Sequence, residues 1–199
     1  MVRWYHAIFT AYGFWLPNDP RGSWSTFVGS WELFKFGPAT KTNLRRSLAR
    51  DPHDSQLRKG AKKALKYPPV RFDAAQRDCI ALGIAQACGE SNIQLLACAI
   101  GFDHVHVVVA RHAKSIELVV GQFKGRATQR MRIANCHPLQ RFARNSQAPP
   151  TPWAERCWSV YINDHPQLRS AIRYVERHPQ KEGLRKQDWW FVTPAVTEV

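Results

Sequence analysis

The chain has 199 residues, of which 44% are hydrophobic, and this composition excludes a globally disordered protein. No apolar run approaches the roughly 18 residues of a transmembrane helix, and the first residues lack the pattern of a signal peptide. The five cysteines are scattered without a CxxC pair, which indicates free thiols in a reducing compartment. We therefore expect one domain over 1–199, in the cytoplasm and without membrane contact.

The positive charge is concentrated in two blocks. The formal net charge is +14; residues 41–71 carry ten lysines or arginines against two acids, and residues 111–145 carry eight against one. Two basic blocks on a near-neutral body indicate a protein that binds a polyanion, with nucleic acid as the first candidate. A surface that is basic only for solubility is the alternative, although solubility in a small domain needs a net charge of only about 2–8.

The first half of the chain predicts a strand, an insertion and a helix. Residues 3–12 are rich in aromatic and β-branched side chains and predict a strand, which a turn-rich segment follows. Residues 30–70 look like a basic insertion, and its helical stretch, 56–67, stops at a pair of prolines. A helix is expected over 73–88, because Asp73 suits its N-cap and a glycine follows its end.

The second half predicts strands and helices in alternation. Two short apolar runs, 92–101 and 103–111, are separated by a hairpin-like break. Apolar residues at helical spacing predict helices over 114–135 and 166–179, with a strand over 157–162 between them. This order predicts an α+β fold of the ferredoxin or RRM-like kind, with helices on one face of an antiparallel sheet and the strand 103–111 at its centre.

Two histidines, His104 and His106, are separated by one residue on the predicted strand 103–111. Because side chains alternate between the faces of a strand, both imidazoles point the same way, with Cα atoms roughly 7 Å apart. The intervening valines point toward the helices. Two neutral imidazoles on one face can bind a divalent ion. The alternative is a pair of histidines that make ordinary hydrogen bonds on a partly solvated sheet face. We interpret His6, on the first strand, as a sheet histidine whose hydrogen bonds are satisfied.

Tyr174 and His178 are four residues apart on the last predicted helix and therefore share a face. Both lie at the edge of the apolar stripe, where a side chain is ordered yet reachable. A phenol with a pKa near 10 is a poor nucleophile unless a metal ion or a neighbouring base assists it. The alternative is a tyrosine that packs at the rim of the core.

Four cations follow the flanks and back of the predicted helix 114–135, and we expect them to contact DNA phosphates. They are Lys124, Arg126, Arg130 and Arg132.

Three segments together resemble the HUH-type single-tyrosine transposases, of the insertion-sequence and REP-associated kind. They are GFDHVHVVVA, SIELVVGQFKGRATQRM, and WAERCWSVYINDHPQLRSAIRYVERHPQKEGL. The opening HAIFTAYGFWLPNDPRGSW resembles the first strand and turn of one subgroup. The resemblance covers most of the chain, and the basic insertion is its least diagnostic part.

The resemblance implies that Tyr174 attacks a DNA phosphorus, which yields a 5′-phosphotyrosine link and a free 3′-OH that later reverses the reaction for joining. It also implies that His104 and His106 bind Mg²⁺ or Mn²⁺. In relatives the third ligand is the polar residue four positions after the tyrosine, often Gln or Asn. Here that position is His178, a departure that favours Mn²⁺ or a softer ion over Mg²⁺.

The implied function is a metal-dependent single-strand DNA endonuclease and strand-transferase. The resemblance further implies a nucleoid-associated homodimer that acts on single-stranded or hairpin DNA; Val107 and Val109 offer apolar surface for either a core or such an interface. A domesticated DNA-binding protein with little or no cleavage is the alternative. A small-molecule hydrolase with an HxH motif is disfavoured, because it usually needs a barrel of about 250 residues.

Overall fold

The computed structural model describes residues 2–14, 16, 31–37, 54–144 and 147–193. It contains two compact units, one formed by Met1–Ala11 with Arg71–Val199 and the other by Tyr12–Val70. No helix within the described ranges is long and apolar enough to span a bilayer. The single domain over 1–199 stays a prediction.

A four-stranded antiparallel sheet organises the first unit. Its strands are β1 (Trp4–Thr10), β2 (Leu95–Ile100), β3 (His104–Ala110) and β4 (Trp158–Ile162), in the spatial order β2-β3-β1-β4. β3 is central, as predicted, and the α+β fold with an antiparallel sheet is confirmed.

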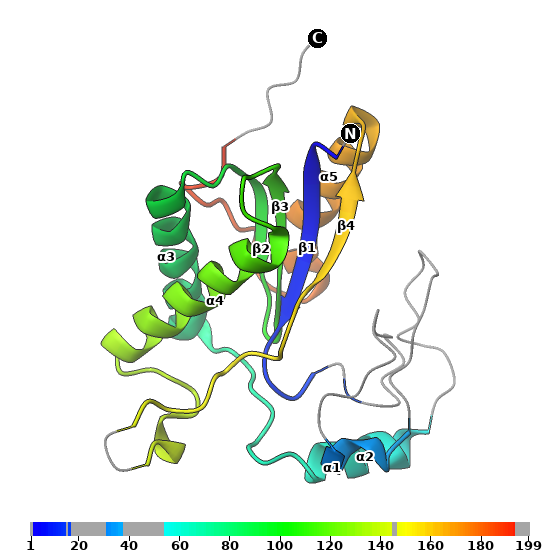
Figure 1. The fold of residues 1–199 in the computed structure, drawn as a ribbon, viewed down its shortest axis with the longest axis vertical. Helices are drawn as coiled ribbons and strands as arrows, with labels where there is room; N and C mark the ends of the chain where they lie inside the picture. Colours follow the sequence, from blue (N-terminus) through cyan, green and yellow to red (C-terminus); the bar gives the residue numbers. More distant parts are fainter. Residues whose placement is uncertain (1, 15, 17–30, 38–53, 145–146, 194–199) are drawn as a thin grey trace. The chain divides into compact units, whose positions relative to one another are not determined.

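Two long helices, α3 (Ala74–Ser91) and α4 (Ile116–Ile133), cover one face of the sheet (Figure 1). Asp73 forms the capping box that begins α3. Val107 and Val109 are 0% and 1% exposed, so these side chains belong to the core and the idea that they offer interface surface is wrong. Alternation along β3 explains their burial, because both point toward the α3–α4 layer.

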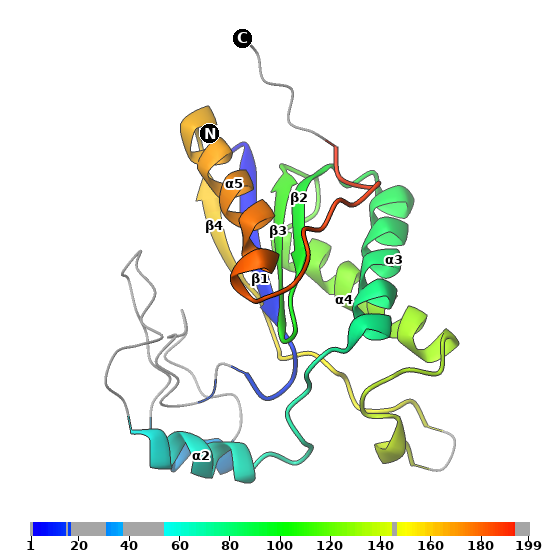
Figure 2. The same cartoon turned by 180° about the vertical axis from the view of Figure 1, so that it is seen from behind.

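Helix α5 (His165–Lys181) lies on the other face of the sheet, as the view from behind shows (Figure 2). The predicted arrangement with helices on one face only is wrong, because the sheet also carries buried apolar residues on the face that α5 covers. Leu168 and Val175 of α5 pack with Val108 of β3 in a separate apolar cluster. The helix continues through Pro179, where the sequence predicted its end. A proline in the last turn removes only one helical hydrogen bond, so His178 keeps helical geometry.

The segment after α5 runs beside β2, which is an edge strand. The Gln187 side chain takes the place of a strand backbone: its Nε2 donates to the Ile100 carbonyl at 2.9 Å, and its Oε1 accepts from the Ile100 N–H at 2.8 Å. Farther on, the Thr193 N–H donates to the Leu95 carbonyl at 2.8 Å. These bonds occupy backbone groups that an edge strand would otherwise expose.

The second unit contains α1 (Trp31–Phe34) and α2 (Ser55–Lys63) among its described residues. Asp54 caps α2 by accepting bonds from two backbone N–H groups. The predicted helix over 56–67 therefore begins one residue earlier and ends four residues earlier. The helix ends at its C-cap, Ala64, four residues before Pro68, and the Ala64 N–H donates to the Gly60 carbonyl. Much of the basic insertion predicted at 30–70 lies outside the described residues.

Candidate functional site

Three imidazoles from two elements meet between the sheet and α5. His104 and His106 project from β3 toward α5, and His178 reaches them from the last turns of that helix. The Nε2 atoms of His104 and His178 are 3.3 Å apart, and the ring centroids of His106 and His178 are 4.2 Å apart. One nitrogen from each ring lies within 4.8 Å of the others, so the three could hold one metal ion.

Burial favours neutral imidazoles at His106 and His178. Burial, followed by the neighbouring His104, lowers the pKa of His178 to about 4 and that of His106 well below its usual value. Neutral rings at pH 7 offer lone pairs, which are what a metal ion requires. The donor set therefore fits a divalent transition metal better than it fits a network of charged histidines.

A carboxylate orients His104. Asp103 Oδ1 lies 2.6 Å from the Nδ1 of His104 and accepts a hydrogen bond from its N–H, so the Nε2 of His104 presents a lone pair toward His178. A second carboxylate, Glu182, has its Oε1 3.8 Å from the same Nδ1. Sequence reasoning missed both residues, although Glu182 could have been found because it lies one helical turn beyond His178.

Gly101 makes room for the second carboxylate. A Cβ atom at position 101 would lie 2.4 Å from Glu182 Oε2, well inside van der Waals contact. A side chain at 101 would therefore push the Glu182 carboxylate away from His104.

Tyr174 is the tyrosine beside the histidine cluster. Its ring centroid lies 5.5 Å from that of His106 and 5.7 Å from that of His178, while 43% of the residue is exposed. Burial of the hydroxyl and the charge of Glu182 raise the pKa of Tyr174. The Lys181 Nζ lies 4.7 Å from the centroid of the Tyr174 ring, which is a cation–π contact. The site thus combines a partly exposed phenol with adjacent imidazoles that could hold a metal ion.

His6 also belongs to this cluster, which sequence reasoning missed. Its Nε2 lies 3.1 Å from the Nδ1 of His106, and both residues are buried. Burial lowers the pKa of His6 to about 4, so this ring is neutral as well. His6 is a hydrogen-bonded sheet histidine, as interpreted from the sequence, but its partner is a histidine of the candidate site. No local signal could have shown the contact, because it depends on how two distant strands pair.

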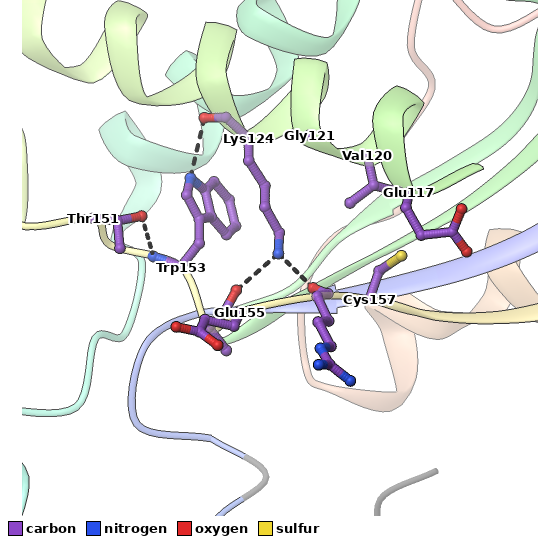
Figure 3. A pocket seen from close by; sticks show the side chains of 10 residues that line it. Glu117, Val120, Gly121, Lys124, Thr151, Trp153, Glu155 and Cys157 are labelled. Carbon is purple, nitrogen blue, oxygen red and sulfur yellow. Dashed lines mark hydrogen bonds between the residues drawn. The ribbon is translucent and has the colours of Figure 1, made fainter. Parts of the chain in front are cut away.

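Lys124, predicted to contact DNA, points into a cavity of about 320 Å³ between α4 and the segment before β4 (Figure 3). Its Nζ donates to the carbonyls of Ala154 and Arg156, the first at 2.8 Å. Burial lowers the pKa of Lys124 to about 8. The hydrogen bonds of the Lys124 ammonium therefore hold residues 154–156 against α4.

The three predicted arginines also lie on α4, across the sheet from the histidines. Arg126 forms an ion pair with Glu90 at 2.7 Å, and Arg130 donates to the side chain of Gln86 at 2.9 Å. Arg132 is exposed and lines a shallow hollow at the end of the helix. The structure does not bring these cations to the candidate metal site, and their DNA contacts stay predictions.

A family model described as IS200-like transposase matches residues 65–178, which is more than half of the chain and includes both pairs of site residues. The chain belongs to this transposase family, and the resemblance found in the sequence is confirmed. No curated protein matches the chain.

Two solved structures are similar to the chain at 12% identity. One is a REP-associated tyrosine transposase bound to a REP hairpin, with a TM-score of 0.48 over 96% of this chain and 74% of that chain. The other is a candidate transposase from Deinococcus radiodurans R1, with a TM-score of 0.39 over 89% and 92% of the two chains.

Proposed function

We propose that the protein is a metal-dependent single-strand DNA endonuclease and strand-transferase, with Tyr174 as the nucleophile. The observation that carries this proposal is the position of Tyr174: a partly exposed phenol beside two imidazoles that could share one ion. Membership of a transposase family supports DNA as the substrate. The net charge of +14 supports a polyanionic partner as well.

His104, His106 and His178 would hold the ion. Imidazole nitrogens suit Mn²⁺ and later transition metals better than Mg²⁺, so we propose Mn²⁺ as the better activator of the two predicted ions. A bound divalent ion polarises a phosphodiester and neutralises the charge that develops on its oxygens.

The step itself needs a deprotonated phenol. The Tyr174 hydroxyl loses its proton as its oxygen bonds to phosphorus, the P–O3′ bond breaks, and the 3′ oxygen takes a proton. The products are a 5′-phosphotyrosine and a free 3′-OH, and the reverse step joins strands. Lys181, with its Nζ 4.7 Å from the ring centroid, would favour the phenolate against the opposing charge of Glu182.

Covalent trapping tests this proposal. A pool of single-stranded and hairpin oligonucleotides, labelled at the 3′ end, is incubated with the protein and Mn²⁺, because the 3′ portion would remain on the enzyme. We expect a labelled protein band on a denaturing gel with the wild type and with Tyr161→Phe, and none with Tyr174→Phe. An adduct that persists in Tyr174→Phe would overturn the nucleophile. DNA binding without any adduct would favour the non-cleaving alternative.

The ion is tested separately from the nucleophile. His104→Ala and His106→Ala should abolish the adduct while DNA binding, measured by fluorescence anisotropy, remains. If either variant still cleaves DNA in the presence of EDTA, His104 and His106 have a structural role and do not bind a catalytic ion. His178→Ala should be less severe, because water can occupy an open coordination position.

We also propose a homodimer and phosphate contacts by Arg126, Arg130 and Arg132. Each phosphate contact contributes about −0.7 to the slope of log affinity against log salt on single strands, so neutralising the three should flatten that slope.

The nucleophile and its histidines come from one chain, so cleavage itself would need no second copy. Light scattering that finds only monomers, free and DNA-bound, would exclude the dimer.

A further inference from the structure

The buried pair of His6 and His106 links the first strand to the candidate metal site. In the β1–β3 register Ile8 lies opposite His106 and His6 lies opposite Val108, so the two histidines are diagonal neighbours on one face. Their rings are stacked at 5.3 Å with an interplanar angle of 27°. A nitrogen–nitrogen distance of 3.1 Å shows that one ring donates a hydrogen bond to the other.

The His6 ring is held in place by two further aromatic residues. Trp158 of β4 contacts it edge-on at a centroid distance of 5.8 Å, and Tyr174 of α5 does so at 5.9 Å. His6 itself is only 9% exposed. A ring packed in this way keeps its orientation, so its Nε2 stays directed at His106.

We infer that His6 is a positioning residue for the ion site: its Nε2 accepts the Nδ1–H of His106, and the Nε2 lone pair of His106 is thereby kept for the metal. The opposite direction of donation would place the proton on the Nε2 of His106 and block it as a ligand. This inference rests on the proposed function, since it takes the ion to bind His106.

The second histidine of the strand is thus oriented differently from the first. Asp103 holds the proton on the Nδ1 of His104, whereas a neutral imidazole does the same for His106. His6 lies outside residues 65–178, the part of the chain that matches the family model. The ion site would therefore also depend on a residue of the first strand. Loss of such an orienting partner commonly weakens metal affinity about 10–100-fold.

Three variants separate orientation from folding. His6→Leu removes the acceptor, and His6→Gln keeps an amide oxygen that can accept the same proton. His165→Leu is the matched control, because His165 is an exposed histidine that contacts Trp4 at the start of α5. Two readouts are used: the ring-nitrogen tautomer of His106 by ¹⁵N NMR on the metal-free protein at pH 7.5, and Mn²⁺ affinity by titration calorimetry.

We expect wild-type His106 to carry its proton on Nδ1, and His6→Leu to lose that preference and bind Mn²⁺ about 10–100-fold more weakly. His6→Gln should recover most of the affinity, and His165→Leu should match the wild type. A proton on the Nε2 of His106, or an unchanged Mn²⁺ affinity in His6→Leu, would overturn the inference. A wild type that binds no Mn²⁺ would instead defeat the proposed function, and the tautomer would still decide the role of His6.

Discussion

Gly83 lies where α3 and α4 come into backbone contact. A Cβ atom there would lie 2.3 Å from the backbone nitrogen of Ala127 and 2.5 Å from its Cα. Ordinary contacts between carbon atoms are roughly 3.5–4.0 Å, so Gly83→Ala must separate the helices by about 1 Å. The obstacle is backbone on both sides, which cannot turn aside as a flexible side chain would.

Two opposing effects set the size of the change. Inserting a methyl group into a packed contact costs about 1–3 kcal/mol, and the upper end applies where backbone must move. Alanine recovers about 1 kcal/mol through its greater helix propensity. Gly83→Ala should therefore lower the free energy of unfolding by about 2 kcal/mol, which corresponds to a fall in Tm of about 4–8 °C for a chain of this size.

Gly89 provides a control in the same helix, since nothing lies within 4 Å of a Cβ added there. Gly89→Ala should raise the stability by roughly 0.5 kcal/mol. Urea unfolding followed by circular dichroism measures both variants. If Gly83→Ala proves as stable as the wild type while Gly89→Ala behaves as expected, α3 and α4 do not meet at backbone distance and the reasoning fails.

Three further changes test other contacts. Lys124→Met leaves two backbone carbonyls without a charged donor and should lower the free energy of unfolding, measured in urea, by about 2 kcal/mol. An unchanged unfolding midpoint would mean that the Lys124 ammonium does not stabilise the fold through these carbonyls. Gly101→Ala should lower the free energy of unfolding by about 1 kcal/mol in the wild type, and by much less when Glu182 is already alanine. If a double-mutant cycle finds the same loss in both backgrounds, residues 101 and 182 are not in contact. The pKa of His6 is lowered from 6.5 to about 4, so the folded state binds fewer protons than the unfolded state between these values. His6 should therefore contribute up to about 3 kcal/mol to the fall in stability from pH 6.5 to pH 4, and a His6→Gln variant that shows the same total fall would refute this contribution.

The local part of the site could be predicted from the sequence. The alternation of a strand places His104 and His106 on one face, and helical periodicity does the same for Tyr174 and His178. Each pair lies within a single element, so no knowledge of packing is needed. That the pairs should meet came from the family resemblance, because the sequence does not state which face of the sheet α5 covers.

Contacts between distant segments could not be predicted. His6 and His106 are 100 positions apart, and their hydrogen bond depends on the register of β1 with β3. Lys124 bonds to carbonyls 30 and 32 positions away, so its charge looked available for DNA when only its place on a helix was known. Composition reports how many charges a protein has, and packing decides which of them reach the solvent.

The segment that follows α5 has a consequence for handling the protein. Its bonds from Gln187 to Ile100 and from Thr193 to Leu95 cover the free side of β2. Without them, a buried apolar strand would offer unpaired N–H and C=O groups to any other chain, which is how sheets add strands and aggregate. Truncations should therefore spare residues 187–193, and an affinity tag or fusion partner should be joined through a linker that leaves this cover in place.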